Sequence, residues 1–104
     1  MKPKGRPKKA RSVNGEPKIG QFSPRGRPGR PDEISLTIDQ FEAIRLADYS
    51  GMMQIDASKQ MKISRQTFGR ILKEAHKNVS DGIVNGKIIK FEGGNINIKR
   101  SRER

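Results

Sequence analysis

The sequence has no cysteine and few aromatic residues, which make up 5% of the chain. Without cysteine there are no disulfides and no cysteine-ligated zinc sites, as is typical of proteins kept in a reducing compartment. No apolar run approaches the roughly 20 residues of a membrane-spanning helix. The basic N-terminus also lacks the apolar segment of a signal peptide. These absences predict a cytoplasmic protein with no membrane partner and, at 31% hydrophobic residues, a small core.

Groups that could perform catalysis are equally scarce. His76 is the only histidine, and one histidine without cysteine is a poor metal site. No Ser/His/Asp grouping and no phosphate-binding glycine loop can be assembled with any specificity, since Gly93-Gly94 is more simply a turn. We therefore expect no enzymatic activity, no metal and no cofactor, and we expect His76 to be structural.

The positive charge is concentrated at the two ends of the chain. Residues 1–31 carry ten Lys/Arg against the single Glu16, a net charge of +9, and residues 99–104 carry +3. The body between them, residues 32–98, carries nine charges of each sign. A neutral body with basic ends is typical of a folded module whose arms bind a polyanion, and such arms add affinity rather than sequence preference.

Residues 1–31 contain all six prolines and no helical periodicity, which predicts a basic, largely irregular arm. Residues 2–9 and Pro24–Pro28 both resemble the AT-hook, a short peptide that binds the minor groove. A general grip on backbone phosphates is the alternative role. The predicted phosphate contacts in the arm are Lys4, Arg6, Lys8, Lys9, Arg25 and Arg27. Residues 18–22 alternate apolar and polar side chains like a short strand that needs a partner, and the strands expected in residues 87–99 are one candidate.

Three helices are predicted in residues 32–86. Thr37 and Gln40 form a capping box for the first helix, which ends before Gly51. The second helix runs from about residue 53 to residue 61. Ser64 is a good N-cap for the third helix, and Asn85-Gly86 is its stop signal.

The third helix has two opposite faces. One face is apolar and contains Phe68, Ile71, Leu72, Ala75 and Val79. The opposite face is a basic stripe, formed by Gln66, Arg70, Lys73 and Lys77. Because the start of such a helix commonly faces DNA bases, four residues are predicted to contact them: Arg65, Gln66, Thr67 and Arg70. Ser64, Lys73 and Lys77 are predicted to contact phosphates.

The end of the chain predicts a β-hairpin over residues 87–99, with strands at residues 87–91 and 95–99 and a turn at Gly93-Gly94. Residues 100–104 form a basic tail. The expected fold class is therefore mainly α: a three-helix helix-turn-helix core in residues 32–86, with a small hairpin and an irregular basic arm. The apolar residues Ile83 and Val84, and those of the hairpin, exceed what one hairpin buries, so self-association as a homodimer is a further hypothesis.

Two stretches carry a resemblance to a known family. Phe41–Asp48 and Ser64–Leu72 resemble small uncharacterised prokaryotic proteins described as predicted DNA-binding proteins. Their helix-turn-helix is similar to the one in region four of bacterial sigma factors. The resemblance extends to residues 22–26 and 85–94, and it implies a DNA-binding fold. The chain has Ser58 where such motifs usually have alanine, and Lys62 where they usually have glycine; Lys62 would then need a left-handed backbone.

The preferred hypothesis is a cytoplasmic, nucleoid-associated protein that binds double-stranded DNA sequence-specifically and regulates transcription. One alternative is a non-specific architectural DNA- or RNA-binding protein dominated by its basic arms. Another is a protein-interaction module, because sigma-like helices also contact RNA polymerase and other proteins.

Overall fold

The computed structural model of the chain describes residues 10–26 and 29–98. The predicted phosphate contacts Lys4, Arg6, Lys8, Lys9 and Arg27 lie outside the described residues, as does the basic tail, residues 100–104.

The helices start and stop at the signals that the sequence predicts. Helix α1, Ile38–Ile44, has the capping box of Thr37 and Gln40 and continues into a π-helical turn, η1, Arg45–Tyr49. Helix α2 spans Gln54–Gln60, and the long helix α3 spans Arg65–Asn85. The Ser64 hydroxyl accepts a hydrogen bond from the Thr67 amide, and Gly86 ends α3 in the left-handed conformation at φ 63°. These predictions are confirmed.

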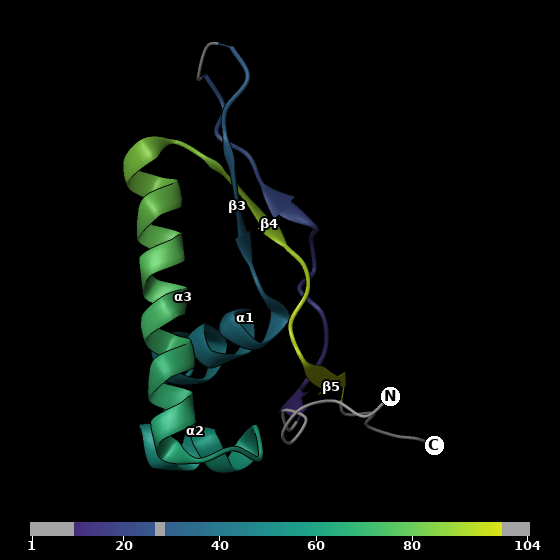
Figure 1. Cartoon of the computed structure of the whole chain (residues 1–104), viewed down its shortest axis with the longest axis vertical. Coiled ribbons are helices and arrows are strands. Elements are labelled where there is room, and N and C mark those ends of the chain that lie inside the picture. The colour runs from purple at the N-terminus through teal and green to yellow at the C-terminus, as the bar shows by residue number, and fades with distance from the viewer. Residues whose placement is uncertain (1–9, 27–28, 99–104) are drawn as a thin grey trace, which may run out of the picture.

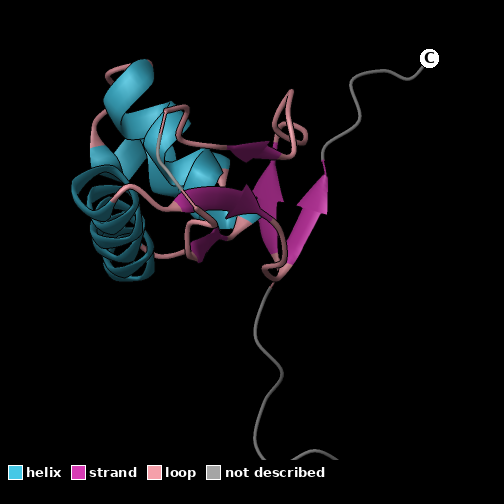
Figure 2. Cartoon of the chain, turned by 90° about the horizontal axis from the view of Figure 1, so that it is seen from above, coloured by secondary structure: helices cyan, strands magenta, loops and turns pink. Residues whose placement is uncertain are grey.

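Five short strands in the described residues form two sheets. Strand β1, Arg11–Val13, pairs in parallel with β5, Ile96–Ile98. In the other sheet β4, Ile88–Phe91, is central; it pairs antiparallel with β2, Gln21–Phe22, and parallel with β3, Glu33–Leu36. The helices gather on one side of the molecule and the strands on the other (Figure 2). Helix α3 runs alongside β3 and β4, while α1 and α2 lie at its N-terminal end (Figure 1).

The prediction of a mainly α fold with a helix-turn-helix core, a C-terminal hairpin and an irregular arm is therefore wrong. The described residues form a mixed α/β fold in which β4 and β5 belong to different sheets. The backbone between them hydrogen-bonds to the start of α1 instead of reversing, with the Ile38 amide donating to the Gly93 carbonyl over 3.1 Å. Because an isolated hairpin is marginal in water, each of these strands gains more by pairing with the N-terminal segment.

The N-terminal strand β1 is fastened to the helices at two points. The Ser12 amide donates to the Met61 carbonyl at the end of α2 over 3.0 Å. The Asn14 amide donates to the buried Glu42 carboxylate of α1 over 3.2 Å. Glu42 also accepts two hydrogen bonds from Arg45, each 2.9 Å long, and these raise the pKa of Arg45 above its ordinary value. Residues 11–14 are thus part of the folded body.

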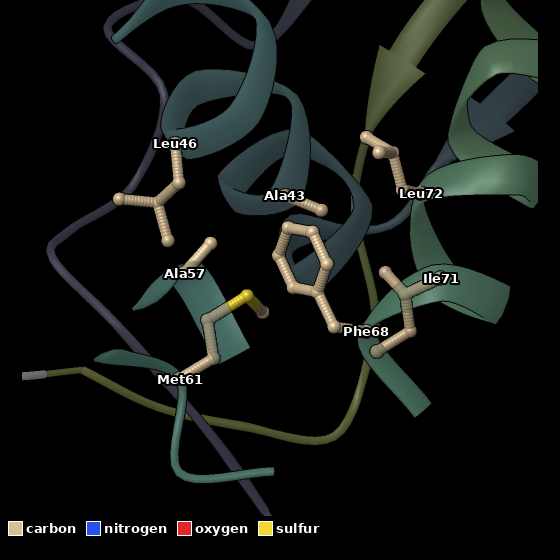
Figure 3. Packing of buried hydrophobic residues seen from close by; sticks show 7 residues of the cluster. All are labelled: Ala43, Leu46, Ala57, Met61, Phe68, Ile71 and Leu72. Atoms are coloured by element: carbon tan, nitrogen blue, oxygen red, sulfur yellow. The ribbon is translucent and has the colours of Figure 1, made fainter. Parts of the chain in front are cut away.

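The main apolar core lies where α1, η1, α2 and α3 meet (Figure 3). Phe68 of α3 is fully buried at its centre, next to the small side chain of Ala43. The buried cluster comprises Ala43, Leu46, Ala57, Met61, Phe68, Ile71 and Leu72. Four of the five residues predicted for the apolar face of α3 are buried, and Val79 is half-buried. The four are Phe68, Ile71, Leu72 and Ala75. The core therefore fixes which face of α3 is turned outward.

Candidate nucleic-acid interface

The face of α3 opposite the core is exposed. Arg65, Gln66 and Arg70 are exposed near the N-terminal end of the helix, and Thr67 is half-buried beside them. Lys73 and Lys77 are exposed further along the same helix. The structure therefore places Gln66, Arg70, Lys73 and Lys77 on one outward face of α3. Thr67 lies on one flank of this face beside Arg70, and Arg65 lies on the other flank. Their contacts with DNA stay predictions.

Ser64 has a structural role at the start of this surface. Its hydroxyl oxygen accepts the Thr67 amide over 3.1 Å and lies 3.0 Å from the Thr67 hydroxyl. Because the side chain already caps α3, it orients the first turn of the helix whether or not a phosphate is present.

The turn between α2 and α3 is held tightly by backbone hydrogen bonds. The Lys62 amide donates to the Lys59 carbonyl over 3.1 Å, and the Ile63 amide donates to the Ser58 carbonyl over 3.0 Å. Lys62 has φ 59°, the left-handed conformation predicted for it. The Ser58 side chain is buried, and its hydroxyl donates a hydrogen bond to the Ile55 carbonyl over 2.8 Å. Serine can therefore stand where such motifs usually have alanine without leaving a buried hydroxyl unpaired.

A basic hollow of about 670 Å³ lies beside this turn. Its lining residues are Arg11, Lys59, Lys62, Ile63, Ser64, Thr67 and Arg70. Four of these described lining residues are cations and none is acidic. Arg11 comes from β1, and its Nε lies 3.7 Å from Oδ2 of Asp39, which is largely buried.

The sequence did not identify Arg11, Lys59 or Lys62 as site residues. Lys59 and Lys62 could have been found from their position just before the Ser64 cap, within one turn of the predicted interface. Arg11 carries no such local signal, because the pairing of β1 with β5 brings it there.

Arg25 is not part of this cluster. It is exposed in the loop between β2 and β3, which lies at the opposite end of the molecule from α2 (Figure 1). Of the phosphate contacts predicted in the arm, Arg25 is the one that lies within the described residues, and its loop lies at the end of the molecule where α3 ends (Figure 1).

A second hollow, the apolar groove, lies between the C-terminal half of α3 and the three-stranded sheet, with a volume of about 510 Å³. Phe91 stands within it, 5.9 Å from Phe22 and 5.6 Å from Phe41 between ring centroids. Its lining residues are Phe22, Ser23, Pro24, Leu36, Phe41, Ile44, Val79, Gly82, Ile83, Gly86, Lys87, Ile89 and Phe91. Ile83 on its rim is 72% exposed, and the adjacent Val84 is 78% exposed.

Lys87 is the one charged residue among the described residues that line the apolar groove. Its ammonium lies 3.0 Å from the Asp81 carboxylate. Hydrogen bonds from Asn85 and Lys87 lower the pKa of Asp81 below its ordinary value. The charge at the edge of the groove is therefore paired.

Fold and surface together define a small mixed α/β protein with a basic face on its longest helix. The chain belongs to the family described as "Protein of unknown function DUF134", which it matches over residues 1–99. Within the described residues, no helix combines the length and the apolar character needed to cross a membrane.

Relatives named UPF0251 protein occur in several bacteria. The one from Prosthecochloris aestuarii is 46% identical over 100 residues, which cover 95% of this chain and 64% of that protein. The relative from Chlorobaculum tepidum is 50% identical over 93 residues, which cover 88% of this chain and 61% of that protein. The relative from Thermoanaerobacter sp. is 44% identical over 100 residues, which cover 95% of this chain and 88% of that protein. The chain thus spans less than two thirds of the first two relatives. No solved structure matches it significantly.

Proposed function

We propose that this protein binds double-stranded DNA with sequence preference, through the exposed face of α3 and the turn that joins it to α2. The observation that carries the proposal is the exposed cationic face of α3, on which three cations have no ion-pair partner. In the described part of the chain, Arg65, Arg70 and Lys73 form no ion pair. Among the described residues, Glu74 and Asp81 are the acids on this side of the helix, and neither forms an ion pair with these three cations; Asp81 pairs with Lys87 instead.

The chemistry of the exposed side chains suits the major groove. A glutamine amide such as that of Gln66 pairs with the adenine edge, and an arginine such as Arg70 pairs with guanine N7 and O6. Lys73 and Lys77, further along the helix, would hold phosphates, which position the protein without choosing a sequence. Under this proposal the protein acts at the nucleoid as a transcriptional regulator. Residues 41–48 and 64–72 resemble a family of predicted DNA-binding proteins whose helix-turn-helix is similar to sigma region four, and this resemblance supports the same proposal.

Selection of bound duplexes from random DNA at near-physiological salt is expected to yield an enriched sequence. On that duplex, Gln66→Ala and Arg70→Ala should each reduce the preference over shuffled DNA by about 5- to 150-fold, since one bidentate base contact contributes about 1–3 kcal/mol of discrimination. Arg30→Ala is the matched control, because Arg30 is also an exposed arginine but lies in the loop between β2 and β3. It should leave the preference unchanged.

The alternatives give different results in the same experiment. If no sequence is enriched and the helix variants lose equally on all duplexes, the protein is a non-specific architectural DNA- or RNA-binding protein. If the wild type binds no nucleic acid even at low salt, the basic face serves a protein partner.

We also propose that two copies of the chain associate through the apolar groove. A two-fold contact needs a surface that complements itself, and this one combines a hollow with the exposed ridge of Ile83 and Val84. The segments outside the described residues, 1–9, 27–28 and 99–104, contain Met1 as their one large apolar side chain, so they could not fill it. Pairing would also present two α3 helices to two DNA half-sites, as helix-turn-helix dimers do.

Ile83→Glu is expected to convert a dimer to a monomer in sedimentation or light scattering, because it places a charge on the contacting ridge. Ser80→Glu, which adds the same charge at another exposed position of α3, should leave the dimer intact. A wild type that stays monomeric at high concentration would contradict the proposal. If such a monomer bound a different protein through the groove, that protein would be the occupant.

A further inference from the structure

The basic hollow draws its cations from four separate parts of the chain. Arg11 belongs to β1, Lys59 to α2, Lys62 to the turn and Arg70 to α3. Lys59, Lys62 and Arg70 have no ion-pair partner among the residues that the structure describes. Bringing like charges together around one hollow costs free energy, and a bound anion offsets that cost.

Lys62 adds a second cost at the same place. Its φ of 59° is a left-handed conformation that a lysine adopts with a penalty and that glycine adopts freely. The turn requires this conformation, because it places the Ile63 amide on the Ser58 carbonyl. Folding alone would therefore favour glycine at position 62, and what lysine adds there is a cation that lines the hollow.

Arg11 reaches the hollow because its strand is fixed on both sides. The Arg11 amide donates to the Asn95 carbonyl over 2.8 Å, and the next amide, that of Ser12, donates to the end of α2 over 3.0 Å. The Asp39 carboxylate, 3.7 Å from Nε, restrains the guanidinium as well. Arg11 is thus positioned before any ligand arrives, which lowers the entropy lost on binding.

We propose that the basic hollow is a seat for a phosphodiester group of the DNA backbone, with Lys62 and Arg11 as its main cations. This inference rests on the proposed function and adds to the base contacts of α3 a specific contact with one backbone phosphate. Thr67 and Arg70 line the hollow and also belong to the predicted base-contacting set. A phosphate held in the seat would therefore fix how far along the groove the first turn of α3 sits. Lys62 and Arg11 add affinity and register, while Gln66 and Arg70 provide the choice of bases.

Lys62→Gly separates this role from folding. The variant should keep or raise the melting temperature, because it relieves the left-handed lysine. Its affinity for any duplex should fall about eightfold at 0.1 M salt, and the slope of log K against log salt should decrease by about 0.9, the value for one lost phosphate contact. Lys62→Arg retains the charge and should restore both values. Lys90→Gln, on β4 and paired with Glu33 over 3.7 Å, is the control for losing one charge elsewhere.

The outcomes distinguish the two proposals. A wild type that binds no duplex contradicts the proposed function itself. A wild type that binds DNA, with a Lys62→Gly variant of equal affinity and equal salt slope, contradicts the phosphate seat alone. Titration with inorganic phosphate at constant ionic strength, followed by amide NMR shifts, tests whether the hollow binds free phosphate instead of a phosphodiester of DNA. Saturable shifts around Lys62, without a change in DNA salt slope, would assign the hollow to free phosphate and overturn the proposal.

Discussion

The Phe68→Ala variant is expected to lose about 3–5 kcal/mol of unfolding free energy, the usual cost of truncating a buried phenylalanine. Phe68 is fully buried between α1, α2 and α3, next to Ala43 and Met61 (Figure 3). The neighbouring alanines cannot fill the space that the ring leaves. Small domains have about 5–15 kcal/mol in total, so the variant should be partly or wholly unfolded at 37 °C. Urea or thermal unfolding followed by circular dichroism measures the loss.

Phe22→Ala is the matched control for Phe68→Ala. Phe22 is 60% exposed and makes one edge contact with Phe91, so its removal should cost about 0.5–1.5 kcal/mol. Equal losses of unfolding free energy in Phe68→Ala and Phe22→Ala would contradict the central position of Phe68 in the core. The comparison also matters for function, because the core around Phe68 is what turns Gln66 and Arg70 outward. A loss of DNA binding in Phe68→Ala therefore reports on folding and not on a base contact.

The helices could be predicted because their signals are local. Ser64 caps α3, Gly86 ends it, and the spacing of Phe68, Ile71 and Leu72 sets its inward face, all within one stretch of sequence. For the same reason the exposure of Arg65, Gln66 and Arg70 could be predicted. The left-handed conformation of Lys62 followed from the resemblance, because the motifs that this turn resembles usually have glycine at that position.

Most of the strand pairing could not be predicted, because the partners are far apart in sequence. The exception is the short strand expected at residues 18–22, whose pairing with the C-terminal strands was one alternative and is found between β2 and β4. Alternating apolar residues identify a strand but not its neighbour, and we expected the nearest one, since sequential strands pair most often. Instead Arg11 pairs with Ile96, and Glu33 pairs with Ile88. Gly93 and Gly94, expected as a hairpin turn, have φ of 81° and 100°. A Cβ at position 94 would lie 2.8 Å from the Asp39 carboxylate, so the glycine lets the chain pass the start of α1.

The same long-range pairing explains what was missed at the candidate site. Arg11 was assigned only to a basic arm, yet β1 makes it part of the folded body and of the basic hollow. Arg25 was grouped with the arm by composition, yet it lies in a loop at the far end of the molecule. Composition gives the total charge of a segment, but only the fold decides which of those charges face the same ligand.

Deletion of residues 2–9 is expected to give the largest change in DNA affinity. It removes Lys2, Lys4, Arg6, Lys8 and Lys9 and leaves β1, which begins at Arg11, intact. At 0.9 per phosphate, five contacts would lower the salt slope by about 4.5 and the affinity by up to about 3 × 10⁴-fold at 0.1 M salt. The ratio between selected and shuffled duplexes should stay constant, because phosphate contacts carry no sequence information. Filter binding at roughly 0.05 to 0.3 M salt measures the affinity, its salt slope and the ratio between the two duplexes.

The deletion also tests the two hypotheses for these residues. Replacing the five cations by glutamine, with Pro3, Gly5 and Pro7 retained, keeps the length of the segment and should reproduce the loss of affinity. A minor-groove role of the AT-hook kind predicts a further result, because narrow A·T-rich minor grooves attract inserted arginine most strongly. Loss confined to duplexes with A·T-rich flanks would support that role and contradict a general phosphate grip. An unchanged salt slope would contradict both, and the attraction for DNA would then rest with α3 and the basic hollow.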